Sequence, residues 1–460
     1  MRETDQKRFE NLVSWAQSHG ARLHPSLEVY HDDLTKFSLR VKETAASLEP
    51  GFVAATCPLS TTLSYLNALL DGPFNISSSP SPEQQAAPTF PARFMSSTPP
   101  HVIGRFFLIH EYLKGNDSLW HPYISTLPRP EQIASWVLPA FWPDEELDFL
   151  EGTNASVAIE EIQANVKREF KQARKILKEE GFPNWQDYSR VLYNWAFCIF
   201  TSRSFRPSLI ASPPAKEEIA KVLPPGCGID DFSILQPLFD IPNHSIMARY
   251  SWNTVSDPTS CQLIPGDAYQ PGDQVYNNYG MKTNSELLLG YGFTLPETEQ
   301  LHNDYVHLRK RQEETGTDKP KDFLISLRPF NHPSSLVGRA RPESFNRSRL
   351  HMLPQFSNFE HSLIEDLVSS LSTEEERQAI DQQNLGGDNV ALEPAIEGLV
   401  GRIKDALSAK LSYDLQRLKD VDIAEGEELA AATNHNQQLA LDYRKQCEKV
   451  ICTALQALGN

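Results

Sequence analysis

Two short stretches constrain the folding of this chain more than any other part of the sequence. The first, Asp240 to His244, ends an apolar run in a Pro-Asn-His turn. The second, Tyr279 to Phe293, begins like a strand, passes through a polar turn, and predicts a short helix over about residues 285–289. Either stretch alone is equally well explained by a buried strand, a turn and a helix, because short motifs often match by chance. Their occurrence together, in this order, favours one shared site.

The pair of stretches resembles the core of SET-domain protein methyltransferases. The resemblance is closest to the branch typified by the Rubisco large-subunit lysine methyltransferase. That branch has a D-x-x-N-H stretch, then N-x-E-L-L-L-x-Y-G-F, then a helical domain that binds the protein substrate. The order of segments extends the match over most of the chain. The resemblance implies an α+β fold class, in which a SET-domain β-fold of short strands is interrupted by a helical insert and followed by an all-helical C-terminal domain.

The length of 460 residues predicts two or three domains. The resemblance places the N-terminal part of the SET domain at 1–100, with a Ser/Pro-rich loop at 72–100, and the helical insert at 101–215. The C-terminal part of the SET domain, with the catalytic core, is expected at 216–296, and the helical substrate-binding domain at 297–460. Apolar stripes at helical spacing support the helical regions: Ile159, Ile162, Val166, Phe170, Ala173 and Leu177; Ile396, Val400, Ile403, Leu407, Leu411, Leu415 and Leu418; and Leu439, Tyr443, Cys447, Ile451, Leu455 and Leu458.

Smaller elements are expected near the N-terminus. A helix within residues 8–20, short strands within 27–33 and 37–42, and a helix at 59–70 follow from the apolar pattern and the Ser/Thr residues that precede the last of them.

The resemblance assigns a cofactor, S-adenosyl-L-methionine, and the residues that bind it. Asn243 and His244 are implied to hold its adenosine and methionine parts, Arg203 its carboxylate, and Tyr291 the region of the transferring methyl. An Arg fork is chemically suited to a carboxylate. In the family a Gly-x-Gly turn approaches the methionine end, but the corresponding stretch here contains no glycine. Its backbone carbonyls are expected to bind the ammonium group of the cofactor, and the residues concerned are Ser38, Leu39 and Arg40.

The resemblance also implies a channel for the lysine substrate. The motif Ser-Arg-x-Phe at 202–205 lines the active site in the family, and its Phe packs on the target lysine. For the tyrosines, an ordinary place in the core is an equally good interpretation. The residues implied for substrate binding are Ser202, Phe205, Asp240, Tyr279 and Tyr305.

The implied reaction is attack of a neutral amine on the methyl of a sulfonium. A lysine ammonium has no lone pair, and its reference pKa is about 10.4, so the site must favour loss of its proton. A desolvated channel and the positive sulfonium both act in that direction. The hydroxyl of Tyr291, the expected catalytic residue, can accept from the amine and make a weak C–H···O contact to the methyl. No metal and no covalent intermediate are required.

The net charge and the spacing of the cysteines indicate which partners, metals and cell compartments to expect. The net charge of −17 argues against nucleic-acid binding and suits a basic protein partner, although it also serves solubility. The six cysteines form no C-x-x-C pair, so no zinc framework is expected, and their scatter fits a reducing compartment. The first residues lack an apolar signal core, and no apolar run is long enough to span a bilayer. A monomer in the cytoplasm or the nucleus, with no membrane association, is therefore expected.

Two alternatives to lysine methylation stay open. A non-catalytic SET module that binds a protein partner is suggested by the absent Gly-x-Gly turn, and a histidine acceptor occurs in one related branch. A nucleotide-binding protein is disfavoured, because no G-x-G-x-x-G follows a strand and no G-K-[ST] loop occurs.

Overall fold

The computed structural model describes residues 3–32, 35–76, 87–132, 136–254, 257–310, 321–341, 350, 353–382, 392–423 and 432–459. The chain forms two compact units, one of residues 1–136 and 164–280 and one of residues 137–163 and 281–460. The longer stretch of the second unit begins at Met281, and the predicted domain boundary after residue 296 stays a prediction. The described residues include no helix with both the length and the apolar character needed to cross a bilayer.

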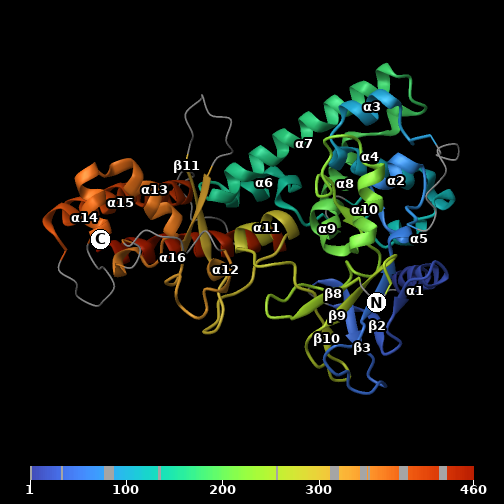
Figure 1. Ribbon diagram of the computed structural model, residues 1–460, viewed down its shortest axis with the longest axis horizontal. Coiled ribbons are helices and arrows are strands. Elements are labelled where there is room, and N and C mark those ends of the chain that lie inside the picture. Colours follow the sequence, from blue (N-terminus) through green and yellow to red (C-terminus); the bar gives the residue numbers. More distant parts are fainter. Residues whose placement is uncertain are drawn as a thin grey trace. The chain divides into compact units, whose positions relative to one another are not determined.

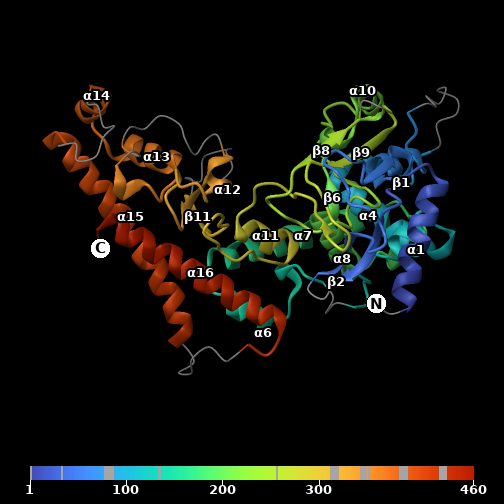
Figure 2. The ribbon, with the colours of Figure 1, turned by 90° about the horizontal axis from the view of Figure 1, so that it is seen from below.

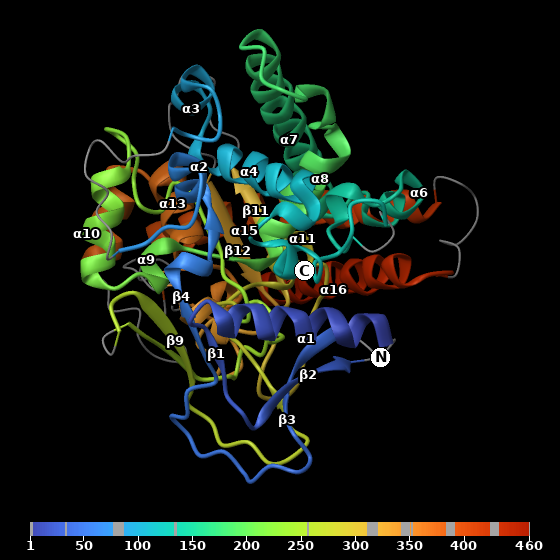
Figure 3. The same ribbon diagram turned by 90° about the vertical axis from the view of Figure 1, so that its right-hand side faces the viewer.

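The first unit contains three small sheets. One has the order β1 (Arg22–Leu23), β4 (Ala55–Pro58), β9 (Ser260–Pro265), β8 (Tyr250–Asn253), and α1 (Glu3–Ser18) packs beside β1 (Figure 3). The second has the order β10 (Gln274–Val275), β3 (Lys36–Val41), β2 (Leu27–Asp32) (Figure 1). The third joins β5 (Leu63–Ser64), β7 (Ile234–Leu235) and β6 (Ser204–Phe205). Every pairing within these sheets is antiparallel. Strands far apart in the sequence are thereby brought together.

Helices cover the rest of the first unit. They are α2 (Tyr65–Leu70), α3 (Ala92–Ser97), α4 (Pro100–Lys114), α5 (His121–Ile124), α8 (Arg190–Arg203), α9 (Pro207–Ile210) and α10 (Pro213–Val222). The centre is α4, which contacts α2 and α8 and buries six apolar side chains in succession around Gly104 and Arg105. Helix α7 (Asn154–Glu179) runs from the second unit into the first, and it buries Ile159, Val166, Ala173 and Leu177 at the predicted helical spacing.

The segment 59–70, expected as one helix, is divided. A 3₁₀ turn at Leu59–Thr61 precedes β5, and α2 begins only at Tyr65. Ser64 and Asn67 form a capping box, in which the Ser64 backbone N–H donates to Asn67 Oδ1 at 2.7 Å. The pairing of β5 with β7 therefore overrides the helical period of the preceding residues. Part of the Ser/Pro-rich loop predicted at 72–100 lies outside the described residues, and its end forms α3.

The second unit is helical apart from one antiparallel pair, β11 (Tyr305–Lys310) and β12 (Lys321–Ser326), which the helical pattern did not indicate. Its helices are α6 (Asp144–Leu147), α11 (Asn284–Tyr291), α12 (Leu336–Arg339), α13 (His361–Leu371), α14 (Glu374–Gln382), α15 (Pro394–Ile423) and α16 (His435–Leu458). The two long helices α15 and α16 lie side by side (Figure 2). Their predicted apolar stripes form much of one continuous core with α13, β11 and β12.

Asn284, the first residue of α11, connects this helix to the rest of the second unit. Its side chain pairs with both backbone groups of Leu295, donating to the carbonyl at 2.9 Å and accepting from the N–H at 2.8 Å. The same Nδ2 donates to Asp304 Oδ1 at 3.2 Å and to Gln446 Oε1 of α16 at 2.9 Å. Its backbone N–H donates to the carbonyl of Asn303 at 2.7 Å. The segment that follows α11 is thus held against the start of the same helix.

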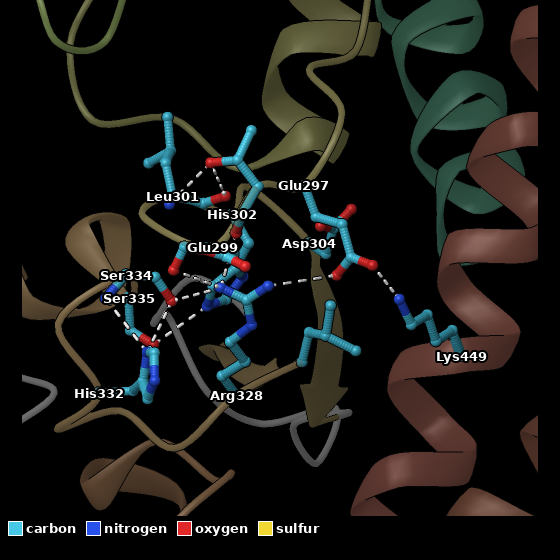
Figure 4. Close-up of polar contacts among 12 residues, drawn as sticks. Glu297, Glu299, Leu301, His302, Asp304, Arg328, His332, Ser334, Ser335 and Lys449 are labelled. Carbon is cyan, nitrogen blue, oxygen red and sulfur yellow. Dashed lines mark hydrogen bonds and ion pairs between the residues drawn. The ribbon is translucent and has the colours of Figure 1, made fainter.

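Charged groups gather beside Asp304 (Figure 4). Arg328 donates to the backbone carbonyl of Thr298 at 2.8 Å and to the Ser334 hydroxyl at 2.9 Å, and Lys449 pairs with Glu297. Asp304 is buried, and its Oδ2 atom has no hydrogen-bond partner among the described residues. Burial first, and then the nearby negative charge of Glu297, raises the pKa of Asp304 to about 6.

Gly292 ends α11 in a conformation that no other residue fits. Its φ is +74°, and a Cβ built there would lie 2.2 Å from the carbonyl oxygen of Val137. Gly290, two residues earlier, has no atom within 4 Å of such a Cβ. We expect Gly292→Ala to lower the free energy of unfolding by about 2–4 kcal/mol, because strain and overlap add. Gly290→Ala should be neutral or stabilising by up to about 1 kcal/mol. Chemical denaturation of both variants tests this, and equal losses would contradict it.

A second prediction concerns Asp304 and pH. The folded pKa of about 6 lies above the ordinary Asp value of 3.8, so the folded state binds the proton more tightly. Stability therefore falls as pH rises from about 4 to 6 and then levels off. Asp304→Asn should remove this fall and stabilise the protein at pH 8 by up to about 3 kcal/mol, from a shift of about two pKa units.

Thermal unfolding at pH 4.5 and pH 8 measures this difference. Asp442→Asn, at an exposed position of α16, is the control and should behave like the wild type at both pH values. An Asp304→Asn protein that is less stable than the wild type at pH 8 would contradict the prediction.

Candidate functional site

The Asn243–His244 turn lies in the first unit between β7 and β8. It is paired with a second backbone segment around Asn277, since the Asn277 N–H donates to the Asn243 carbonyl and the Ser245 N–H donates to the Asn277 carbonyl, both at 2.8 Å. The bridge between His244 and Asn277 is parallel. The first predicted stretch and the start of the second therefore lie directly against each other.

The Asn243 side chain joins this turn to the end of the second sheet. Its Nδ2 donates to Gln274 Oε1 at 3.0 Å and to Thr35 Oγ1 at 2.6 Å, and its backbone N–H donates to Ser38 Oγ at 3.4 Å. Gln274 and Thr35 were not identified from the sequence. Both are common polar types without a motif, so only their position across β3 and β10 reveals them.

The stretch that lacks the Gly-x-Gly pattern still contains a left-handed turn. Lys36, at the start of β3, has φ +74°, which is the region that glycine usually occupies. Leu39 and Arg40 are paired with strands on both sides, whereas Lys36 to Ser38 pair with β2 alone. Among the described residues, this edge of β3 thus has a strand partner at 39–40 and none at 36–38.

The predicted residues of β3 differ in their surroundings. Ser38 and Leu39 are fully buried, and Ser38 Oγ donates to Gln274 Oε1 at 3.3 Å. Arg40 forms an ion pair with Glu28 at 2.9 Å, and its guanidinium carbon lies 5.0 Å from the centroid of the Tyr30 ring. The Arg40 side chain is thus engaged on the β2 side of the sheet.

His244 is fixed by Tyr279. The Tyr279 backbone N–H donates to His244 Nδ1 at 3.0 Å, and the two rings stack with centroids 5.0 Å apart and an interplanar angle of 22°. Because Nδ1 accepts, the neutral imidazole carries its proton on Nε2. The Tyr279 hydroxyl donates to the Pro242 carbonyl at 2.9 Å. The predicted channel tyrosine therefore also holds the Asn-His turn in place.

Asp240 forms a buried charge cluster with Arg203 and Tyr123. Tyr123 Oη donates to Asp240 Oδ2 at 2.9 Å, and Arg203 Nη1 donates to the same oxygen at 3.3 Å and to the Asp240 carbonyl at 3.2 Å. Burial raises the pKa of Asp240, while Arg203 acts against this rise. Tyr123 was not identified from the sequence, because "HPYI" carries no distinguishing pattern. The Arg203 side chain as a whole is about 32% exposed.

Ser202 and Phe205 flank Arg203 at the end of α8. Ser202 Oγ donates to the Cys198 carbonyl one turn earlier at 2.8 Å. Phe205 meets Trp252 edge to face, with ring centroids 5.5 Å apart. Trp252, on β8, is a further aromatic side chain of this region that the sequence did not single out.

Tyr291 lies in the second unit, as the last residue of α11. Burial first, and then the Glu286 carboxylate, raises the pKa of Tyr291 to about 12, so the phenol stays neutral at physiological pH. Tyr305 is fully buried in the same unit, where its hydroxyl accepts from the Gly338 N–H at 3.0 Å and its ring stacks on His302. Tyr291 and Asn243 belong to different units. The expectation that they line one pocket stays a prediction.

The hollows, the possible metal ligands and the cysteines of the described residues add no further group to the predicted site. Two hollows of the first unit, of about 430 and 210 Å³, are lined by residues other than the predicted ones. No three His, Cys, Asp or Glu of the described residues lie close enough together to hold a metal ion. All six cysteines are thiols.

Comparison with known proteins places this geometry in context. No protein-family model matches the chain. The ribosomal lysine N-methyltransferase set10 of Schizosaccharomyces pombe is 29% identical over 338 residues, which are 71% of this chain and 54% of that protein. The human N-lysine methyltransferase SETD6 is 28% identical over 193 residues, or 41% of this chain and 37% of that protein. The chain thus spans about half the length of the first of these curated relatives.

Solved structures extend the likeness to the whole chain. The SET domain of the Rubisco large-subunit methyltransferase bound to lysine and AdoHcy superposes with a TM-score of 0.61 at 16% identity, covering 98% of this chain and 91% of that one. At this identity the likeness establishes the fold. In sequence the chain is thus similar to lysine N-methyltransferases, and its fold is that of the SET domain of the Rubisco large-subunit methyltransferase.

Proposed function

We propose that this chain is an S-adenosylmethionine-dependent protein-lysine N-methyltransferase. The observation that carries the proposal is the joining of three separate segments at Asn243. Its side chain binds Gln274 of β10 and Thr35 beside the left-handed turn of β3, and the next residue, His244, is fixed by Tyr279. Two segments that the family resemblance assigns to the cofactor, Asn243–His244 and the start of β3, thus contact each other, which supports the proposal. The named relatives are lysine N-methyltransferases.

The residues present suit the proposed cofactor chemically. The Arg203 guanidinium suits a carboxylate, because among the described residues both of its hydrogen bonds are donated by Nη1 and its other N–H groups can serve a ligand. Backbone carbonyl oxygens of the β3 stretch with Ser38, Leu39 and Arg40 are proposed to bind the ammonium group, and residues 36–38 of this strand pair with β2 alone. Asn243 and His244 would hold the adenosine side, with His244 neutral and its proton on Nε2. When bound, S-adenosylmethionine supplies an electrophilic methyl on sulfur.

The remaining chemistry belongs to this chain. Tyr291 is neutral at physiological pH, so its hydroxyl can accept a hydrogen bond from an amine and orient the nitrogen lone pair. Ser202, Phe205, Asp240 and Tyr279 are proposed to line the lysine channel, and Tyr305 to support it from the core of the second unit. Holding the amine in line with the methyl is worth roughly 7–11 kcal/mol in favourable intramolecular reactions.

The partner in this proposal is a protein that carries the target lysine. The net charge of −17 favours a basic substrate and disfavours nucleic acid. The protein is proposed to act as a monomer in the cytoplasm or the nucleus.

Asn243→Ala should weaken binding of S-adenosylmethionine. The change removes both the hydrogen bond to Gln274 and the one to Thr35, so the turn loses its connection to β3. We expect the Kd to rise about tenfold or more, in line with about 1–3 kcal/mol for a lost polar network. Isothermal titration calorimetry measures it. Asn165→Ala, at an exposed position of α7, is the control and should bind like the wild type.

Tyr291→Phe should abolish transfer while leaving cofactor binding within a few fold, because it removes only the hydroxyl. Cell lysate is incubated with labelled S-adenosylmethionine and either protein, and the modified residues are identified by mass spectrometry. Tyr413→Phe, on the exposed face of α15, is the control and should retain full activity.

The same experiment decides between the alternatives. Methylated histidine in place of lysine would change the acceptor class. A wild type that binds no S-adenosylmethionine and modifies nothing would overturn the proposed activity in favour of a binding module.

A further inference from the structure

Lys282 places a positive charge beside the proposed catalytic tyrosine. Its ammonium lies 5.6 Å from the centroid of the Tyr291 ring, within the range of a cation–π interaction. The two side chains are nine residues apart in the sequence, with Lys282 just before the N-cap of α11 and Tyr291 at the end of this helix. The sequence reading assigned Lys282 no role.

The position of Lys282 is well determined by its backbone. Its carbonyl accepts from Asn303 Nδ2 at 2.6 Å. The next residue, Thr283, caps α11 by accepting from the Glu286 N–H through its hydroxyl, and the Thr283 N–H donates to Glu286 Oε2 at 2.8 Å. The lysine side chain is half-buried, so its charge is less screened than one on an open surface.

The negative charge near Lys282 is shared with a second cation. The Glu286 carboxylate of α11 attracts Lys282, but Arg341 donates to both of its oxygens at 2.8 and 2.9 Å. Among the described residues, no ion pair joins Lys282 to a carboxylate. His307 of β11 faces the same helix end, where its Nε2 lies 2.9 Å from Thr283 Oγ1, and burial lowers the pKa of His307 so that it is neutral. Tyr291 is likewise a neutral phenol.

We propose that Lys282 is an electrostatic residue of the methyl-transfer site, where its fixed positive charge favours the neutral over the protonated form of the incoming substrate lysine. The inference rests on the proposed function, because it requires the target amine to approach Tyr291. A second ammonium near Lys282 is repelled, whereas a neutral amine is not. The attacking nitrogen must give up its proton before it can form a bond to carbon, so this repulsion acts on the form that cannot react.

A purely structural role makes a different prediction. If Lys282 only packs on the Tyr291 ring, its removal should lower the rate by the same factor at every pH. If its charge acts on the substrate amine, the loss should be large at low pH and should disappear where solvent alone removes the proton. The pH dependence of kcat separates these cases, because kcat reports ionisations within the enzyme–substrate complex.

The test measures kcat between pH 7 and 10 with the acceptor protein identified in the lysate experiment, at saturating concentrations. Lys282→Met keeps the length of the side chain and removes the charge, and Lys282→Arg keeps the charge. We expect Lys282→Met to move the acid limb of the profile upward by about one pH unit. Its kcat should be about tenfold lower near pH 7.5 and close to the wild-type value near pH 10, and Lys282→Arg should follow the wild type.

The outcomes are distinguishable. Parallel profiles for the wild type and Lys282→Met would overturn this inference and leave the proposed methyl transfer standing. A wild type that transfers no methyl at any pH would overturn the proposed function and this inference with it. If Lys282→Met unfolds, as read by circular dichroism, Lys282→Gln replaces it as the neutral variant, with the same expected shift.

Discussion

The contact between His244 and Tyr279 is the interaction on which the candidate site depends. One backbone hydrogen bond and one ring stack lock the imidazole, and the Tyr279 hydroxyl returns to the carbonyl just before Asn243. With the turn held in this way, Asn243 can direct its amide to β3 and β10. Such mutual support makes a polar site rigid, because each donor is oriented by a neighbour that is itself bonded.

Each of the two units contains a buried aspartate, and the surroundings of the two carboxylates differ. Asp240 is compensated by the Arg203 guanidinium and the Tyr123 hydroxyl, so its ionised form is supported although burial opposes it. Asp304 has the amide of Asn284 and the distant Lys449 and Arg328, and burial dominates. Two carboxylates of the same type thus acquire different proton affinities from their surroundings alone.

Several contacts fix both ends of the short helix α11. A capping box fixes its start, Arg341 binds the Glu286 of that box, and Gly292 ends it where only glycine fits against Val137. Asn284 then ties the following Leu295 back to the first turn. These constraints hold the Tyr291 backbone and the Lys282 backbone in a defined relation, which is the geometry that an electrostatic role for Lys282 requires.

The sequence by itself determined the local elements and the order of the motifs. Helical period located α7, α15 and α16, and the Asn-His and Gly-Tyr-Gly stretches indicated the SET-domain fold, because these signals lie within short windows. Only the tertiary structure decided that Thr35, Gln274 and Tyr123 belong to the site, that Lys36 takes the left-handed turn without a glycine, and that β5 interrupts the helix expected at 59–70. Those outcomes depend on pairing between segments that are far apart in the chain and on which charged groups are buried together. A local sequence pattern contains neither kind of information.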